Sequence, residues 1–168
     1  MWYVVQTIKG KEQKVLDEIL EHDVTQEGEE AFILYNEKMY KHQGKWHAEH
    51  KNLFAGYLFV DTDEPKEFDK RLHKQNRTIK LLRVNDVITP IYENEMERLL
   101  LLGGEDHIVR YSEGFRNGDE VNITSGALKG FDGKIKRLDR HNRQAVITLS
   151  LFGRETDVTL GLGIVKSI

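Results

Sequence analysis

A group of basic side chains near the end of the chain could bind phosphate groups. Between positions 129 and 143 there are six lysine and arginine residues and two aspartates, although the whole chain has a formal net charge of −3. The candidate residues are Lys129, Lys134, Lys136, Arg137, Arg140, His141 and Arg143. Arginine can clamp a phosphate or stack on an unpaired base, so the segment indicates RNA binding. A solvated surface that keeps a small domain soluble has the same composition.

Other residue types offer less chemistry. His42, His47 and His50 lie close together in the sequence, but no cysteine or carboxylate completes a metal-binding spacing, so we expect no metal. Ser125 lies in Thr-Ser-Gly, which is not the surrounding of a catalytic serine. The Gly-Leu-Gly at positions 161–163 is too short for a dinucleotide-binding loop. We therefore expect neither an enzyme nor a cofactor-binding protein.

Length and composition bound the class of protein. A chain of 168 residues can form one large or two small domains, and the absence of cysteine excludes disulfides and fits a reducing cytoplasm. The opening Met-Trp-Tyr-Val-Val predicts a strand rather than a signal peptide, and no apolar run is long enough to span a membrane. We therefore expect a cytoplasmic protein that has no membrane partner.

The first part of the chain predicts an α+β domain. An N-terminal strand precedes an amphipathic helix over 12–22, in which apolar residues recur at helical spacing. The polar segment 36–51 is typical of a projecting hairpin. Tyr40 and Trp46 flank Gly44 on its two sides, so we expect aromatic contacts between the two strands of this hairpin.

The remainder of this first domain alternates strands and helices. The apolar run 53–60 predicts a central strand, Pro65 can open a helix, and 79–84 predicts another strand. A last helix starts at Asn94, with Leu100 among the side chains that we expect to face inward. This order predicts helices packed on an antiparallel sheet.

The C-terminal part has the pattern of a small all-β domain. Residues 105–114 are polar and without periodicity, so we expect a linker between a domain over 1–104 and a domain over 115–168. Gly118 to Ile135 reads Gly-Asp-Glu-Val-Asn-Ile-Thr-Ser-Gly-Ala-Leu-Lys-Gly-Phe-Asp-Gly-Lys-Ile, which resembles the KOW motif of small β-barrels. An ordinary hairpin would have a similar pattern. The short strands that follow predict an SH3-like barrel.

Four motifs, in order, resemble the NusG family of transcription elongation and antitermination factors. They are Trp-Tyr-Val-Val-Gln at 2–6, Phe-Ala-Gly-Tyr-Leu-Phe-Val at 54–60, the KOW motif, and Leu-Phe-Gly-Arg at 151–154. The resemblance implies an N-terminal NGN domain that binds bacterial RNA polymerase and a C-terminal KOW domain. Ala55 stands where the family has proline. The basic KOW segment is most like that of LoaP-type paralogues, which implies a leader RNA hairpin as a partner.

The resemblance also implies which residues contact the polymerase. Phe54 and Tyr57, with Gln6 near them, match the family's pocket for the β′ clamp helices, although these aromatic residues could equally belong to the core. Lys70 and Arg71 match the region that faces the β gate loop. The histidine-containing hairpin would then lie near non-template DNA.

The expected function is therefore that of a monomeric factor that promotes processive elongation through pauses and terminators. A first alternative is a housekeeping NusG-type factor in which Leu151, Phe152 and Arg154 contact ribosomal protein S10 or Rho. A second alternative is a ribosome-associated RNA-binding protein that shares only the KOW module. The N-terminal motifs argue against this second alternative.

Overall fold

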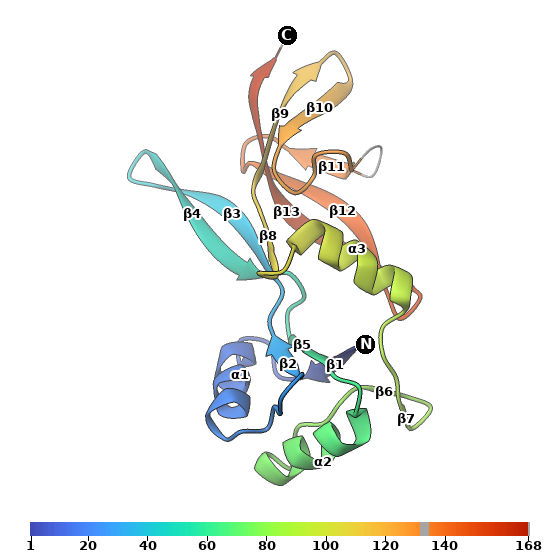
Figure 1. Ribbon diagram of the computed structural model, residues 1–168. Coiled ribbons are helices and arrows are strands. Elements are labelled where there is room, and N and C mark those ends of the chain that lie inside the picture. The colour runs from blue at the N-terminus through green and yellow to red at the C-terminus, as the bar shows by residue number, and fades with distance from the viewer. Residues whose placement is uncertain (132–134, 168) are drawn as a thin grey trace. The chain divides into compact units, whose positions relative to one another are not determined.

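The computed structural model describes residues 1–131 and 135–167. A mixed α+β N-terminal part with three helices is followed by a β-rich C-terminal part, which confirms the predicted fold class (Figure 1). The chain forms two compact units. The first unit comprises Met1–Leu34 and Phe54–Glu97, and the second unit comprises Tyr35–Leu53 and Arg98–Ile168.

The first unit is built on a three-stranded antiparallel sheet. Its strands are β1 (Trp2–Gln6), β5 (Tyr57–Asp61) and β2 (Glu30–Phe32), in the order β1-β5-β2. The prediction of a central strand is confirmed, because β5 pairs on both edges and the side chains at 58–60 are fully buried. The strand starts later than predicted, because the residues before it form a turn around Gly56, whose φ is +85°.

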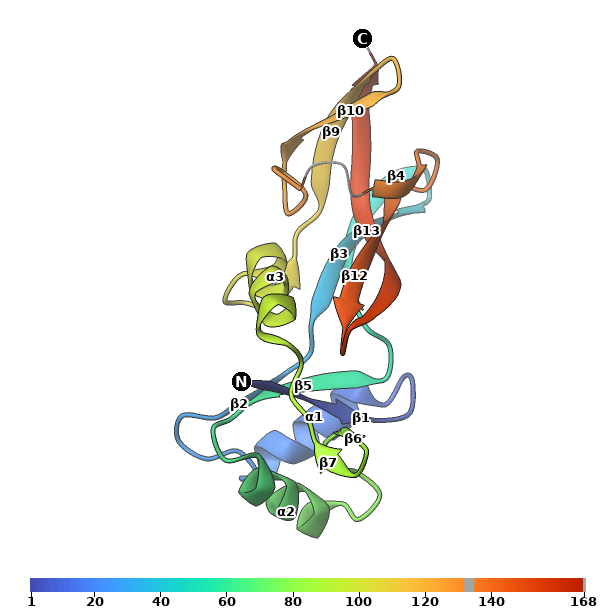
Figure 2. The same ribbon diagram turned by 90° about the vertical axis from the view of Figure 1, so that its right-hand side faces the viewer.

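Two helices cover one side of this sheet. They are α1 (Glu12–Glu21) and α2 (Pro65–Gln75), and both lie on the same side of the strands in the two perpendicular views (Figures 1 and 2). Pro65 starts α2 because a proline at the first helical position lacks only an N–H that would be unpaired anyway. The apolar side chains that the helices bury are Val15, Leu16, Ile19, Phe68 and Leu72.

Two predictions for this part of the chain need correction. The predicted strand over 79–84 is reduced to β6 (Arg83–Val84), which pairs with β7 (Val87–Ile88), and to an isolated bridge formed by Leu81. In α3 (Glu93–Gly103), Leu100 is 38% exposed, so the expectation that it faces inward is wrong. Leu99 and Leu102 are buried instead.

The predicted hairpin lies in the second unit. It consists of β3 (Tyr35–His42) and β4 (Lys45–Asn52), and β3 also pairs in parallel with β8 (Ile108–Val109). Gln43 and Gly44, the two residues of the turn, both have positive φ. This is the backbone conformation of a type I′ turn, whose twist matches that of the two strands.

The aromatic pairing predicted for this hairpin is wrong in its register. Tyr40 is opposite His47, with ring centroids 5.3 Å apart, whereas Trp46 is opposite Lys41. Successive side chains of a strand point to opposite faces, so Tyr40 and Trp46 lie on different faces of the hairpin. The offset of one residue arises because Gln43 and Gly44 together form the turn, so that position 40 is opposite position 47.

The rest of the second unit is a five-stranded sheet in the order β10-β9-β13-β12-β11. Its strands are β9 (Ser112–Asn117), β10 (Glu120–Ser125), β11 (Ile135–Asp139), β12 (Gln144–Leu151) and β13 (Arg154–Ser167). The first part of β13 pairs antiparallel with β12, and its last part pairs in parallel with β9. One long strand therefore joins the two halves of the sheet.

The segment predicted as a linker is ordered and packed. It contains β8 and the start of β9, and Val109 and Ser112 are buried. The Ser112 hydroxyl accepts a hydrogen bond of 2.9 Å from the N–H of Leu128. Gly126, in the glycine-rich motif, lies against the backbone of Tyr111 and Ser112. The division into domains over 1–104 and 115–168 stays a prediction.

This contact predicts a difference between two glycines of the motif. Both Gly126 and Gly118 have positive φ, but a Cβ on Gly126 would lie 2.3 Å from the Tyr111 carbonyl oxygen, and a Cβ on Gly118 would meet nothing within 4 Å. Gly118→Ala should cost about 1–2 kcal/mol of unfolding free energy, from the left-handed backbone alone. Gly126→Ala should lower the unfolding free energy clearly more than Gly118→Ala does. Urea unfolding of the full chain measures both losses. Equal losses would contradict the steric argument.

Candidate functional site

A groove in the second unit gathers several of the residues predicted to bind RNA. It has a volume of about 470 Å³ and is lined by the β9–β10 hairpin and by β11 with the residues that follow it. The basic side chains in its lining are Arg116, Lys136, Arg137 and Arg140. Arg116 lies outside the predicted segment, and only the folding of β9 beside this groove brings it there. The groove therefore concentrates positive charge from two separate segments.

The basic residues of the groove differ in their availability. The Lys136 ammonium forms an ion pair of 2.7 Å with Asp157, and Arg116 lies 3.7 Å from Asp119 and donates to the Gly118 carbonyl oxygen. Within residues 1–131 and 135–167, neither Arg137 nor Arg140 forms an ion pair, and both are exposed. These two guanidinium groups can therefore bind a phosphate without breaking an ion pair.

The turn between β11 and β12 has a defined structure. The Asp139 carboxylate accepts hydrogen bonds from the Asn142 backbone N–H at 3.0 Å and from its side-chain amide at 2.8 Å. These bonds lower the pKa of Asp139 below its ordinary value, because they stabilise the ionised form. His141 is exposed on this turn. The turn thus presents Arg140 and His141 to solvent.

Arg143 has a different role from its neighbours. Its guanidinium lies over the ring of Trp46, 4.1 Å from the centroid, and its backbone has a φ of +52°. Trp46 belongs to β4, so this cation–π contact joins the β11–β12 turn to the β3–β4 hairpin. Sequence reasoning placed Arg143 among the basic residues of the patch but could not identify this partner, which is far away in the chain.

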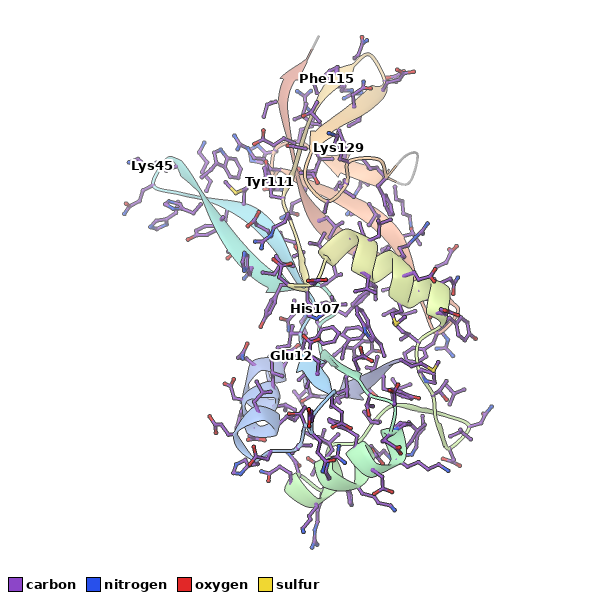
Figure 3. All side chains as sticks on the ribbon, viewed as in Figure 1. Glu12, Lys45, His107, Tyr111, Phe115 and Lys129 are labelled. Atoms are coloured by element: carbon purple, nitrogen blue, oxygen red, sulfur yellow. The ribbon has the colours of Figure 1, made fainter. Side chains whose placement is uncertain are left out.

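Two other predicted RNA-binding residues are not part of the groove. Lys129 is exposed on the turn after β10 and does not line the groove (Figure 3). Lys134 lies outside the described residues. The structure therefore brings together Lys136, Arg137 and Arg140 from the predicted set.

The residues predicted to form the polymerase-binding pocket lie in the first unit. Phe54 is buried, with its ring centroid 6.0 Å from that of Phe59, so it is part of the core. Tyr57 is half-buried and pairs in register with Gln6, which is exposed at the end of β1. Gln6 also borders a hollow of about 480 Å³ that includes Ile8, which is 74% exposed. Tyr57, Gln6 and Ile8 are thus accessible to a partner.

Glu12 positions this surface, and no pattern in the sequence indicates this role. Its side chain is buried at the start of α1 and accepts hydrogen bonds from the N–H groups of Gly10 at 2.9 Å and Gly56 at 2.6 Å (Figure 3). Gly56 needs its positive φ here, and a Cβ would lie 3.0 Å from the Thr7 carbonyl oxygen. Glu12 therefore fixes the turn that separates Phe54 from Tyr57.

The two basic residues predicted to face the gate loop differ from each other. Lys70 is exposed and forms a surface ion pair of 3.3 Å with Glu67. Arg71 donates to the Val24 carbonyl oxygen at 2.8 Å and to the Glu29 carboxylate at 2.6 Å. Arg71 therefore ties α2 to the loop before β2, and only Lys70 is readily available to a partner.

The residues of the alternative protein-contact site lie at the β12–β13 turn. Leu151 is buried in the core, whereas Arg154 is exposed opposite it in the register. Phe152 and Gly153 both have positive φ, as in a type I′ turn. Phe152 is half-buried on this turn.

The described parts of the chain contain neither a cluster of metal-binding side chains nor a helix that could span a membrane. No group of three or more histidine, aspartate or glutamate side chains converges within residues 1–131 and 135–167. None of the helices in these ranges combines the length and the apolar character that a membrane span requires.

The Asp139 hydrogen bonds predict a pH-dependent turn. A carboxyl group whose pKa is lowered on folding stabilises the fold above its ordinary pKa of 3.8, and this contribution is lost as the pH falls through the lowered value. The side-chain carboxyl carbon resonance of Asp139 should therefore change only in acid stronger than about pH 4. Asp139→Asn should abolish this transition. A transition of the Asp139 carboxyl centred at or above the ordinary value would contradict the assignment.

Comparison with known proteins agrees with this architecture. The family described as "Transcription termination factor nusG" matches residues 1–100. The NusG proteins of Pasteurella multocida and Haemophilus influenzae, which are transcription termination/antitermination proteins, are each 26% identical to the chain. The alignments cover 95% of this chain and 90% of the former protein, and 99% of this chain and 94% of the latter.

A solved structure of Thermotoga maritima NusG supports the fold. Its TM-score is 0.50 at 24% identity, and the match covers 95% of this chain and 92% of that one. The family match over residues 1–100 lies in the part that a ribosomal protein sharing only the KOW module would lack. The chain belongs to the NusG family of transcription termination and antitermination factors.

Proposed function

We propose that this protein is an elongation and antitermination factor that binds RNA polymerase through its N-terminal part and RNA through its C-terminal part. An RNA hairpin in the leader transcript is the expected nucleic-acid partner, as for a specialised LoaP-type paralogue. Binding to one conformation of the polymerase disfavours the paused state by the difference in affinity between the two states. The factor acts by binding and carries out no chemical step.

The observation that carries the RNA-binding proposal is the basic groove. Four basic side chains line it in a chain whose formal net charge is −3, so the positive charge is local and not a property of the whole surface. Among these basic residues, Arg137 and Arg140 are the ones that can bind a phosphate without first leaving an ion pair. Double-stranded RNA is bound mainly through its shape and its phosphates, which suits a groove that offers cations from two segments.

The polymerase-binding proposal rests on Tyr57, Gln6 and the exposed Ile8 beside them. Apolar and aromatic surface around a few polar groups is typical of protein interfaces. Phe54 supports this surface from inside the core. Lys70 is the basic residue that is available for the gate loop.

A second candidate function follows from the β12–β13 turn. The half-buried Phe152 and the exposed Arg154 stand on this tight turn, where they can contact a protein such as ribosomal protein S10 or Rho. This arrangement would support a housekeeping NusG-type role. In the housekeeping role Arg154→Ala would weaken binding to the protein partner, whereas Arg137→Ala, at a residue of the basic groove, would not.

Replacing one groove arginine should weaken RNA binding. Arg137→Ala should lower the affinity for a leader RNA hairpin, and the slope of log K against log salt should fall by about one per lost phosphate contact. Arg154→Ala removes the same charge outside the groove and serves as the matched control. Gel-shift titrations at several salt concentrations measure both. Equal effects of the two substitutions would reject the groove in favour of non-specific charge.

Replacing Tyr57 should weaken polymerase binding. Tyr57→Ala removes aromatic area worth about 2–3 kcal/mol when it is fully buried in an interface. Tyr92, which is 54% exposed in the first unit, offers the control Tyr92→Ala. Pull-down of core polymerase should fall for the first variant and not for the second. Because Tyr57 also contributes to folding, circular dichroism must first show that the variant is folded, and a folded variant with parental binding would reject the surface.

A further inference from the structure

We propose that the β3–β4 hairpin is a second RNA-binding element, in which Trp46 stacks on an unpaired base of a single-stranded stretch beside the folded RNA. This inference rests on the proposed RNA-binding function and extends it to a new site. Its starting point is the Trp46–Arg143 contact, because it joins the hairpin to a turn that already carries Arg140 of the basic groove.

Arg143 is held firmly in place beside the indole. Its carbonyl oxygen accepts a hydrogen bond of 2.9 Å from the N–H of Leu162 in β13, which fixes the backbone of the turn. Tyr111 lies close by, and the positive charge of Arg143 opposes the rise that burial causes in the pKa of Tyr111. The backbone of Arg143 is therefore fixed beside Trp46, and its guanidinium remains within reach of the phosphate of a nucleotide that stacks on the indole.

The hairpin has the charge that a polyanion requires. From 38 to 48 it contains Lys38, Lys41, Lys45, His42 and His47 and no acidic residue. Lys41 is exposed and lies directly opposite Trp46 in the register, so the two share one face of the hairpin. A base on Trp46 would thus have a lysine near its phosphate.

The contact with Arg143 can be exchanged for a stacked base. The half-buried indole is covered by the half-buried Arg143 guanidinium, and a cation–π contact is similar in strength to the stacking of a base on an aromatic side chain. An unpaired base can therefore take the place of the guanidinium. The released Arg143 then binds the adjacent phosphate, so its positive charge is still used.

The basic groove and the hairpin together favour RNA with a stem and a tail. The groove supplies cations for a stem, whose bases are not accessible in the deep major groove of A-form RNA. The hairpin supplies an aromatic face, which suits an unpaired base. Arg140 and Arg143, three residues apart on one turn, connect the two surfaces. The predicted ligand is thus a hairpin flanked by a single-stranded segment.

The test uses the full chain and two RNAs, a blunt hairpin and the same hairpin with a single-stranded tail of about eight nucleotides. The tail should tighten binding to the parent protein. Trp46→Ala should remove this gain, a loss of about 5- to 150-fold for the tailed RNA, and should leave binding of the blunt hairpin unchanged. Trp46→Phe should keep most of the gain, because an aromatic face remains. Tyr40→Ala removes an aromatic side chain from the opposite face and should have little effect.

Fluorescence provides a readout that a purely structural role would not change. The chain has two tryptophans, and Trp2 is 4% exposed in the core, so quenching by the tailed RNA reports on Trp46. Quenching should follow the binding curve of the tailed RNA and be absent with the blunt one. Equal tail gains in the parent and in Trp46→Ala would overturn the proposal. An equal increase in affinity from a single-stranded DNA tail would also overturn it, because the hairpin would then be a DNA-binding element.

The outcome also separates this inference from the proposed function. If Arg137→Ala weakens both RNAs while Trp46→Ala affects neither, the groove binds RNA and only the hairpin assignment fails. If Arg137→Ala affects neither RNA, the proposed RNA-binding function itself fails.

Discussion

The second unit depends on the close packing of Gly161, in the middle of β13. A Cβ at this position would lie 2.4 Å from the Glu37 carbonyl oxygen of β3 and 2.7 Å from the Tyr111 ring. At Gly163 a Cβ would collide with the Tyr111 hydroxyl. Glu37 also accepts the Tyr111 backbone N–H at 3.1 Å. Only glycines allow the hairpin, the segment before β9 and the long strand β13 to meet here, and the position of Arg143 beside Trp46 follows from this packing.

The parts of the fold that local patterns determine could be predicted from the sequence. The helix α2 follows from Pro65 and from apolar residues at helical spacing, and the β3–β4 hairpin follows from a turn that contains Gly44. The pairing of β3 with β8 and of β9 with β13 could not be predicted, because parallel partners are far apart in the chain and no local turn signals them. Residues 105–114 were predicted to be a linker for the same reason, because the strands β3 and β13 against which they pack are far away in the chain.

The candidate site was predictable in its charge and not in its contacts. Composition pointed to Lys136, Arg137 and Arg140, and the fold places all three in one groove. Composition could not distinguish an arginine that faces solvent from one that serves the structure. Arg71 is the clearest example, because the same guanidinium that could bind a partner holds Glu29 and the Val24 carbonyl oxygen. Long cationic side chains form contacts across the surface that only a folded chain reveals.

The hydrogen bond between Glu12 and Gly56 links two residues that are 44 positions apart. Contacts between distant parts of a chain form late in folding, because the entropy of closing the intervening loop opposes them. The final shape of the turn before β5 therefore includes a contact with α1 that closes a long loop of the chain. During synthesis, the first 56 residues must all leave the ribosome before this turn can form. The surface around Tyr57 therefore depends on contacts with distant segments of the N-terminal part, and the local sequence of the turn is not sufficient to form it.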